Sequence, residues 1–65
     1  MDISQVKKNL GRKVVYNGTE YLLSGCIIRP DEQNGFYYQA ELQDLKANSS
    51  VIICALPEVK EDKNG

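Results

Sequence analysis

The sequence predicts a small, mainly β domain of four to five antiparallel strands with a short N-terminal helix. Three observations lead to this fold class. An Asn-Gly pair at 17–18 lies between two stretches rich in β-branched and aromatic residues, residues 36–43 alternate apolar with polar, and residues 50–55 form an apolar run of strand length. The 65-residue chain suffices for one such domain, which we expect to cover residues 1–59.

Residues 2–10 are predicted to form the helix. Asp2 can cap its N-terminus by accepting from first-turn amides, and Gly11 suits the left-handed residue that closes a helix. The predicted apolar face comprises Ile3, Val6 and Leu10. Because so short a helix is unstable alone, we expect this face to dock on the sheet, over an open end of a barrel.

A β-hairpin over residues 12–29 is expected to organise the rest of the chain. A two-residue loop fits the twist of its strands as a type I′ turn, which needs positive φ at both positions. Asn17 followed by Gly18 tolerates that conformation best, and β-branched and aromatic residues flank the pair on both sides.

The second strand of this hairpin, which begins at Thr19, is too long to stay straight in so small a domain. We expect it to bend at Gly25, since an interior glycine permits a bulge, and Ile27 to return to the core after the bend. Pro30 has no backbone N–H to donate and is expected to end the strand.

The later chain is predicted to add two or three strands. Residues 36–43 direct Phe36, Tyr38, Ala40 and Leu42 to the core and Tyr37, Gln39, Glu41 and Gln43 to water. The uninterrupted apolar run at 50–55 indicates a strand covered on both faces, for example by the helix on one. Whether a fifth strand forms at Val59 stays open, and the polar residues 60–65 are expected to be disordered.

The bent hairpin, the long third strand, the apolar fourth strand and the exit Leu56-Pro57-Glu58-Val59 resemble the SH3-like small barrels, over about residues 12–59. This resemblance implies a partly open barrel. The acidic specificity loop and the Trp with which SH3 domains bind proline-rich peptides are missing, so that activity is not carried over. Residues 10–14 (LGRKV) and 35–42 (GFYYQAEL) also resemble small uncharacterised proteins of bacterial phages and mobile elements, which implies a bacterial cytoplasmic accessory protein.

Several function classes find no support in the composition. Without any His, neither a Ser-His nor a Cys-His pair can be built, and the five glycines are too scattered to form a phosphate-binding loop. Two Cys are too few ligands for zinc. We therefore expect no enzymatic activity, no cofactor and no metal.

The cysteines Cys26 and Cys54 each lie within an apolar, strand-like stretch. We expect two small buried thiols in the reducing cytoplasm, with a disulfide between neighbouring strands as the alternative. No apolar run approaches the ~20 residues needed to span a bilayer, so no membrane association is expected.

Nucleic-acid binding is the less favoured of two functional hypotheses. The net charge is −1, yet four cations fall within seven residues and Tyr16 lies at the hairpin tip. These cations are Lys7, Lys8, Arg12 and Lys13. Together with Tyr16 they would contact phosphates and stack on bases, whereas the simpler interpretation is a solvated basic stripe.

Protein–protein binding is the favoured hypothesis, with this chain as an adaptor or modulator. The outward face of the third strand combines an aromatic residue with hydrogen-bonding groups, as the rim of an interface does. The predicted contact residues are Arg29, Tyr37, Gln39 and Glu41. The partner is another protein or a second copy of the chain, since an edge strand can pair with either and a domain this small gains stability by dimerising.

Overall fold

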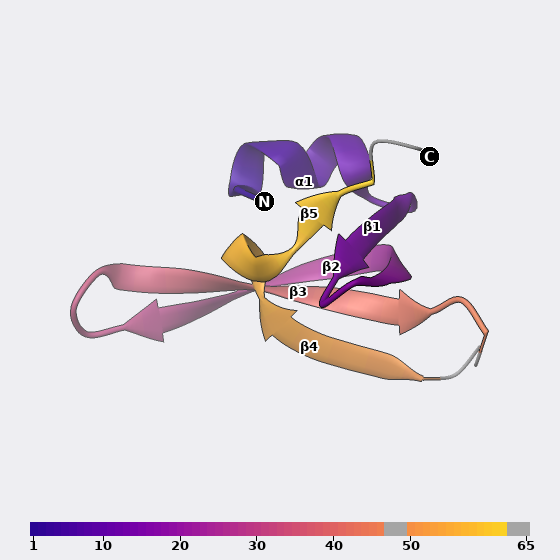
Figure 1. Cartoon of the computed structure of the whole chain (residues 1–65). Coiled ribbons are helices and arrows are strands. Elements are labelled where there is room, and N and C mark those ends of the chain that lie inside the picture. The colour runs from indigo at the N-terminus through magenta and orange to yellow at the C-terminus, as the bar shows by residue number, and fades with distance from the viewer. Residues whose placement is uncertain (47–49, 63–65) are drawn as a thin grey trace.

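The computed structural model describes residues 1–46 and 50–62, and in this part of the chain a single open sheet carries one helix (Figure 1). The elements are α1 (Ile3–Asn9), β1 (Lys13–Tyr16), β2 (Thr19–Asp31), β3 (Gly35–Asp44), β4 (Val51–Ala55), the 3₁₀ helix η1 (Leu56–Glu58) and β5 (Lys60–Glu61). The five strands are antiparallel and lie in the order β4-β3-β2-β1-β5. The predicted fold class, mainly β with a short N-terminal helix, is confirmed.

The turn between β1 and β2 has the predicted conformation. Asn17 and Gly18 have φ of 52° and 79°, and Tyr16 pairs directly with Thr19. Positive φ at both loop residues is what a type I′ turn requires. The hairpin that we expected to organise the chain is therefore confirmed.

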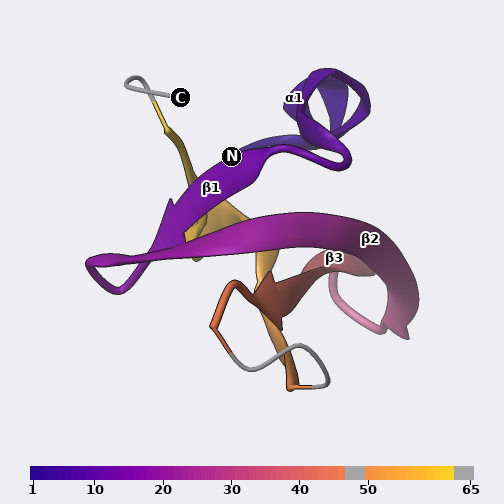
Figure 2. The same cartoon turned by 90° about the vertical axis from the view of Figure 1, so that its right-hand side faces the viewer.

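A bulge lies where β2 was expected to bend. The register of β2 on β3 shifts between Leu23 and Gly25, so that Ser24 and Gly25 together oppose Glu41. Figure 2 shows β2 as a long, strongly curved ribbon. A bulge of this kind bends a strand and increases its twist.

The bulge also reverses the side-chain alternation of β2, and the prediction that Ile27 returns to the core is wrong. Cys26 pairs with the buried Ala40 and packs against the core, whereas Ile27 pairs with Gln39 on the opposite, outer face of the sheet. The extra residue at Ser24 shifts the period-two pattern by one, which exchanges the two faces from there on.

Pro30 does not end β2, which continues to Asp31. The Asp44 N–H donates to the Ser50 carbonyl (3.0 Å), so even-numbered residues of β3 direct their backbone groups toward β4. The backbone N–H and C=O groups of Phe36, the partner of Pro30, therefore point away from β2. The backbone nitrogen of Pro30 correspondingly faces the open edge of β2. No hydrogen bond to β3 is lost, and proline is tolerated there.

The core-facing side chains of β3 follow the predicted alternation. Ala40 and Leu42 are fully buried and Tyr38 is half-buried. Phe36 shares their face, yet 51% of it is exposed, so the prediction that it enters the core is wrong. β4 pairs with β3 only from Gln39 onward, so Phe36 lies beyond the part of the sheet that other elements cover.

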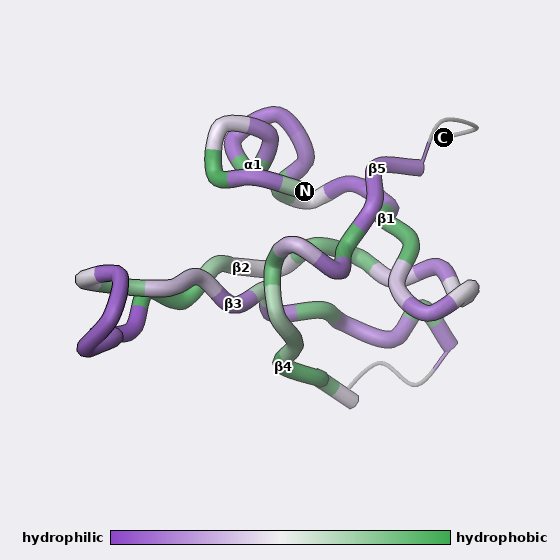
Figure 3. Tube along the Cα trace, turned by 60° about the vertical axis from the view of Figure 1, so that its left-hand side comes forward, coloured by the Kyte–Doolittle hydropathy of each residue, from purple (hydrophilic) through white to green (hydrophobic). Residues whose placement is uncertain are grey.

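The prediction that β4 is covered on both faces is wrong. Its Cys54 is buried, while Val51 and Ile53 on the other face are 51% and 45% exposed. β4 lies at one edge of the sheet, and α1 lies above β1 and β5 at the other edge (Figure 1). Figure 3 shows that the β4 tube is nevertheless hydrophobic along almost its whole length.

The termini of α1 are as predicted, but its buried face is not. Asp2 caps the helix in a capping box with Gln5, and Gly11 has a φ of 79°. Ile3 and Leu10 are exposed, and the buried helical residues are Val6 and Asn9. The reason is that α1 docks through Val6, which joins the core, and through side-chain bonds from Gln5 and Asn9 to Glu61 of the last strand, β5, and not through the whole predicted stripe.

β5 completes the sheet at Lys60–Glu61, directly after Val59, where the sequence left a fifth strand open. The expectation that residues 60–65 are disordered is therefore wrong for Lys60 and Glu61, and residues 63–65 lie outside the described residues. Val59 is fully buried. The hydrophobic core consists of Val6, Val14, Leu23, Ala40, Leu42, Cys54, Leu56 and Val59.

The two cysteines are not in contact. Cys26 and Cys54 are the register partners of Ala40 on its two sides, so one whole strand separates them. At about 4.8 Å per strand, their Cα atoms lie about 10 Å apart, beyond the ~7 Å limit of a disulfide. Both are free thiols.

Candidate functional site

The hairpin of β2 and β3 extends beyond the rest of the sheet, and we call its outer part, residues 28–38, the arm (Figure 1). Ile28 and Phe36 lie on the face of the arm that continues the core, and they are 63% and 51% exposed. The Phe36 ring packs edge-to-face on Tyr38, with centroids 5.3 Å apart. The arm therefore presents an ordered but uncovered apolar face.

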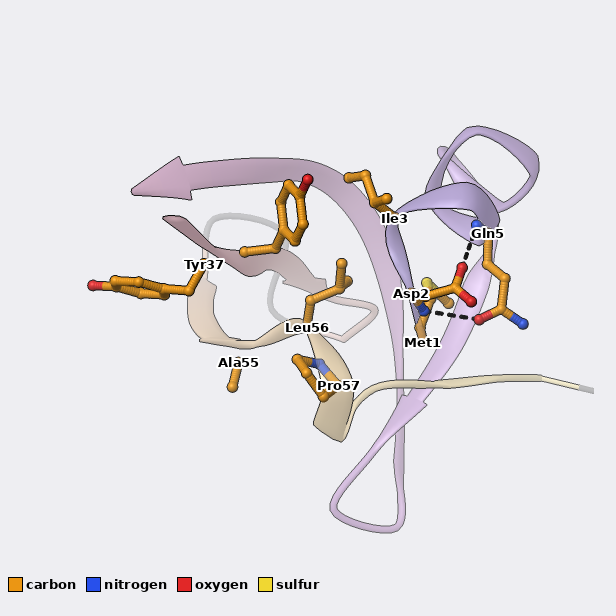
Figure 4. Close-up of a pocket in the computed structure, with 9 residues that line it drawn as sticks. Met1, Asp2, Ile3, Gln5, Tyr37, Ala55, Leu56 and Pro57 are labelled. Carbon is orange, nitrogen blue, oxygen red and sulfur yellow. Dashed lines mark hydrogen bonds between the residues drawn. The ribbon is translucent and has the colours of Figure 1, made fainter. Parts of the chain in front are cut away.

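A groove of about 710 Å³ lies at the base of the arm (Figure 4). Its walls come from three elements: Ile3 at the start of α1, Tyr37 and Tyr38 of β3, and Leu56 and Pro57 of η1. Figure 4 shows Leu56 at the centre of this group, between Tyr37 and Ile3. The size lies within the range of ligand pockets, about 300–1,000 Å³.

The groove exists because β4 ends before β3 does. The last register pair of the two strands is Gln39 with Ala55, and the chain then turns away into η1. By the alternation of β3, Phe36 and Tyr38 direct their backbone N–H and C=O groups to the side that β4 has left. In the part of the chain that the structure describes, no strand pairs with this edge.

Carboxylates border this apolar surface. Asp2 lines the groove, Glu58 follows Pro57, and Asp31 lies at the tip of the arm. A hydrogen bond from the Ser4 hydroxyl (2.6 Å) and backbone N–H donors lower the pKa of Asp2. Asp2 is thus ionised at neutral pH, and the N-terminal ammonium of Met1, which also lines the groove, lies close enough to offset part of its charge.

The four predicted contact residues lie together on the outer face of β2 and β3. Arg29 is the register partner of Tyr37, and its Nε donates to Gln39 Oε1 (2.6 Å). Glu41 Oε2 accepts from the Ser24 hydroxyl (2.9 Å). Their polar groups bond one another or the bulge, while Tyr37, 43% exposed, also borders the groove.

The basic segment of the alternative hypothesis is exposed but bordered by acids. Its members Lys7, Lys8, Arg12 and Lys13 all face solvent. Next to Lys13, the pKa of Glu20 is raised by a hydrogen bond with the Asp62 carboxyl and by the charge of Asp62. Tyr16 packs against the core with its ring 6.3 Å from that of Tyr21. Carboxyl groups therefore border the basic segment at Lys13, and the Tyr16 ring is partly covered by the core.

Metal-ligand clusters and membrane-spanning helices are both absent from residues 1–46 and 50–62. There, no three His, Cys, Asp or Glu side chains gather as metal ligands do. In the same residues, no helix has the length and apolarity needed to cross a membrane. Burial raises the pKa of the Cys26 thiol and of the Cys54 thiol, the latter also through Glu58.

The residues that the sequence analysis missed as surface candidates are Ile3, Ile28 and Phe36. The sequence pattern places Ile3 on the docking face of the helix and Phe36 on the core side of its strand, and it makes no assignment for Ile28. The missing signal was strand length: β2 and β3 have 13 and 10 residues, whereas β4 has 5. β4 is therefore too short to pair with β3 along its whole length, and the outer parts of β2 and β3 extend beyond it.

Comparison of the chain with known protein families, with curated proteins and with solved structures finds no match. No activity or ligand can therefore be carried over from another protein. The function has to be inferred from the arm and the groove.

Proposed function

We propose that this chain is a non-enzymatic binding module whose groove and arm receive an apolar segment of another protein. The observation that carries this proposal is the exposure of Ile28 and Phe36 on a face that elsewhere forms the core. A contiguous exposed apolar surface typically marks an interaction site. Covering the exposed half of the Phe36 side chain would stabilise a complex by about 1 kcal/mol.

An extended partner segment fits this surface best. The free edge of β3 at Phe36 and Tyr38 can bond the backbone of an added strand that continues the line of β4, and the groove can hold alternate side chains of that strand. The carboxylates of Asp2, Asp31 and Glu58 favour a partner with Lys or Arg beside its apolar residues. Tyr37, which was predicted as a contact, lies at the border of this surface.

The strand order supports a further proposal, that the open sheet is a partly open SH3-like barrel. β5 pairs with β1, η1 connects β4 to β5, and the bulged β2 curves strongly. Two free thiols agree with a cytoplasmic protein. The resemblance to phage and mobile-element proteins stays a prediction.

The experiment is a selection of random 12-residue peptides against the immobilised chain, followed by fluorescence anisotropy with the selected peptides. The peptides are expected to combine apolar residues with Lys or Arg. Phe36→Ser should weaken their binding about tenfold. The matched control is Leu45→Ser, which removes a similarly exposed apolar side chain away from the groove and should leave binding unchanged.

Tyr37→Ala tests the border of the surface and the orientation of β3. It should leave folding nearly unchanged, as judged by thermal unfolding, and weaken peptide binding. Unfolding of this variant would show that Tyr37 faces the core.

Equal binding by wild type and Phe36→Ser would contradict the proposed surface. Binding of labelled single or double strands at about 50 mM salt that fades by about 200 mM would instead support the nucleic-acid alternative.

A further inference from the structure

The open edges of the sheet differ in their protection against pairing with another chain. β5 consists of Lys60 and Glu61, and α1 holds Glu61 through side-chain bonds. The outer half of β2 carries the bulge and the residues Arg29, Pro30 and Asp31. Charges, proline and bulges are the features with which natural sheets prevent edge pairing.

β4 has none of these features. Its sequence, VIICA, contains neither a charged residue nor proline. Val51 and Ile53 are both about half exposed, and the tube of β4 is hydrophobic in Figure 3. An uncharged apolar edge is a template for pairing with another strand.

The register of β4 fixes which of its backbone groups are available. Because Ser50 accepts from Asp44, the residues Ile52 and Cys54 also direct their N–H and C=O groups toward β3. Val51, Ile53 and Ala55 therefore direct theirs to the open edge. The apolar side chains and the outward backbone groups belong to the same residues.

We propose that β4 pairs with β4 of a second copy of this chain, antiparallel, about a two-fold axis at Ile53. Ile53 then faces Ile53 of the second copy, and Val51 faces Ala55 of the second copy. The three register pairs supply about six backbone hydrogen bonds. The two sheets join into one continuous sheet, with Val51 and Ile53 of both copies together on its outer face.

The symmetry of the register favours a second copy over an unrelated strand. In the antiparallel arrangement the three outward-facing residues of one β4 oppose the same three residues of the other, so each outward backbone group meets a partner and no charged side chain enters the pairing. β4 has 5 residues, far fewer than the about 20–30 per side of a standard interface. The dimer is therefore weak, with a dissociation constant of about 0.1–1 mM.

This inference does not depend on the proposed groove function. The two surfaces share Ala55, but Ile53 lies outside the groove lining and Phe36 lies outside β4. Phe36→Ser should therefore weaken peptide binding and leave dimerisation unchanged. Ile53→Lys should do the opposite, so a failure of one proposal can be told from a failure of the other.

The test is sedimentation equilibrium of the full chain from about 10 μM to about 2 mM. Wild type should pass from monomer to dimer over this range. Ile53→Lys, which places two like charges at the two-fold axis, should raise the dissociation constant at least about tenfold. Leu10→Lys, at a similarly exposed site at the end of α1 and near the opposite edge of the sheet, is the matched control and should behave as wild type.

Amide hydrogen exchange followed by NMR tests the register itself. At high concentration the amides of Val51, Ile53 and Ala55 should gain protection, whereas those of Ile52 and Cys54 are protected at every concentration. A wild-type chain that stays monomeric at about 2 mM would overturn the proposal. So would an Ile53→Lys variant that dimerises as wild type does, or concentration-dependent protection confined to other strands.

Discussion

The side chain of Asn9 holds α1 on β5, and its removal is expected to destabilise the domain. Only 8% of Asn9 is exposed, and its Nδ2 donates to the Gln5 carbonyl (2.8 Å) and to Glu61 Oε2 (2.7 Å). A hydrogen bond to a charged group contributes about 1.5–3 kcal/mol. Water can replace part of the bond at the exposed Glu61, so we expect Asn9→Ala to cost about 1–2 kcal/mol.

This loss is large for a domain of this size. At 0.05–0.15 kcal/mol per residue, the total unfolding free energy is about 3–10 kcal/mol. A loss of 1–2 kcal/mol should lower Tm by roughly 7–15 °C. Alanine is the better helix former, so the measured loss understates the contribution of the two hydrogen bonds.

The assay is urea denaturation followed by far-UV circular dichroism, with Lys8→Ala as the control on the exposed side of the same helix. A double-mutant cycle of Asn9→Ala with Glu61→Ala isolates the bond between them. A coupling energy of about 1 kcal/mol is expected. The reasoning is refuted if Asn9→Ala lies within about 0.5 kcal/mol of wild type, or if the two changes add without coupling.

Two further predictions concern titratable groups. The raised pKa of Glu20, caused by the hydrogen bond and charge of Asp62, means that folding disfavours the ionised carboxylate. This loss of stability is present above the folded pKa of Glu20 and disappears as the pH falls through that pKa. Glu20→Gln should therefore raise Tm at pH 7 and leave Tm unchanged near about pH 4. An equal rise of Tm at both pH values would contradict this prediction. Because burial raises the pKa of both thiols, Cys26 and Cys54 should react with a disulfide reagent at about pH 8 more slowly than free cysteine, and fast labelling of the native chain would contradict this.

Features that depend on neighbouring residues alone were predictable from the sequence. The type I′ turn follows from the φ values that Asn17 and Gly18 tolerate. Asp2 and Gly11 end α1 as their chemistry dictates, and the core side of β3 follows from strict alternation. In each case a few covalently close atoms determine the conformation.

Features that depend on distant residues were not predictable. Gly25 signalled the bend, but the bulge gains its extra residue from Ser24, whose hydroxyl bonds Glu41 of another strand. That residue alone decides whether Cys26 or Ile27 enters the core. Asn9 was likewise unremarkable in the sequence, because its partner Glu61 is 52 positions away.

The candidate site likewise has features that were predictable from the sequence and features that were not. The alternation of β3 placed Tyr37, Gln39 and Glu41 on one outer face, and the register adds Arg29 to it as predicted. The exposed apolar face of the arm was missed, because Phe36 has the pattern of a core residue. Its exposure follows from where β4 ends, which only the pairing of the strands reveals.

The end of β4 at Ala55 relates the core to the binding surface. Directly after it, η1 carries the buried Leu56, and Val59 then enters the core before β5 pairs with β1. Three more residues of β4 would have paired with the open edge of β3 and filled the groove. The same three residues would have moved Leu56 and Val59 further along the chain, away from the core positions that they now fill, and would have left the core open beside α1. The exposed arm is therefore a consequence of how the core closes, which explains why Ile28 and Phe36 stay uncovered.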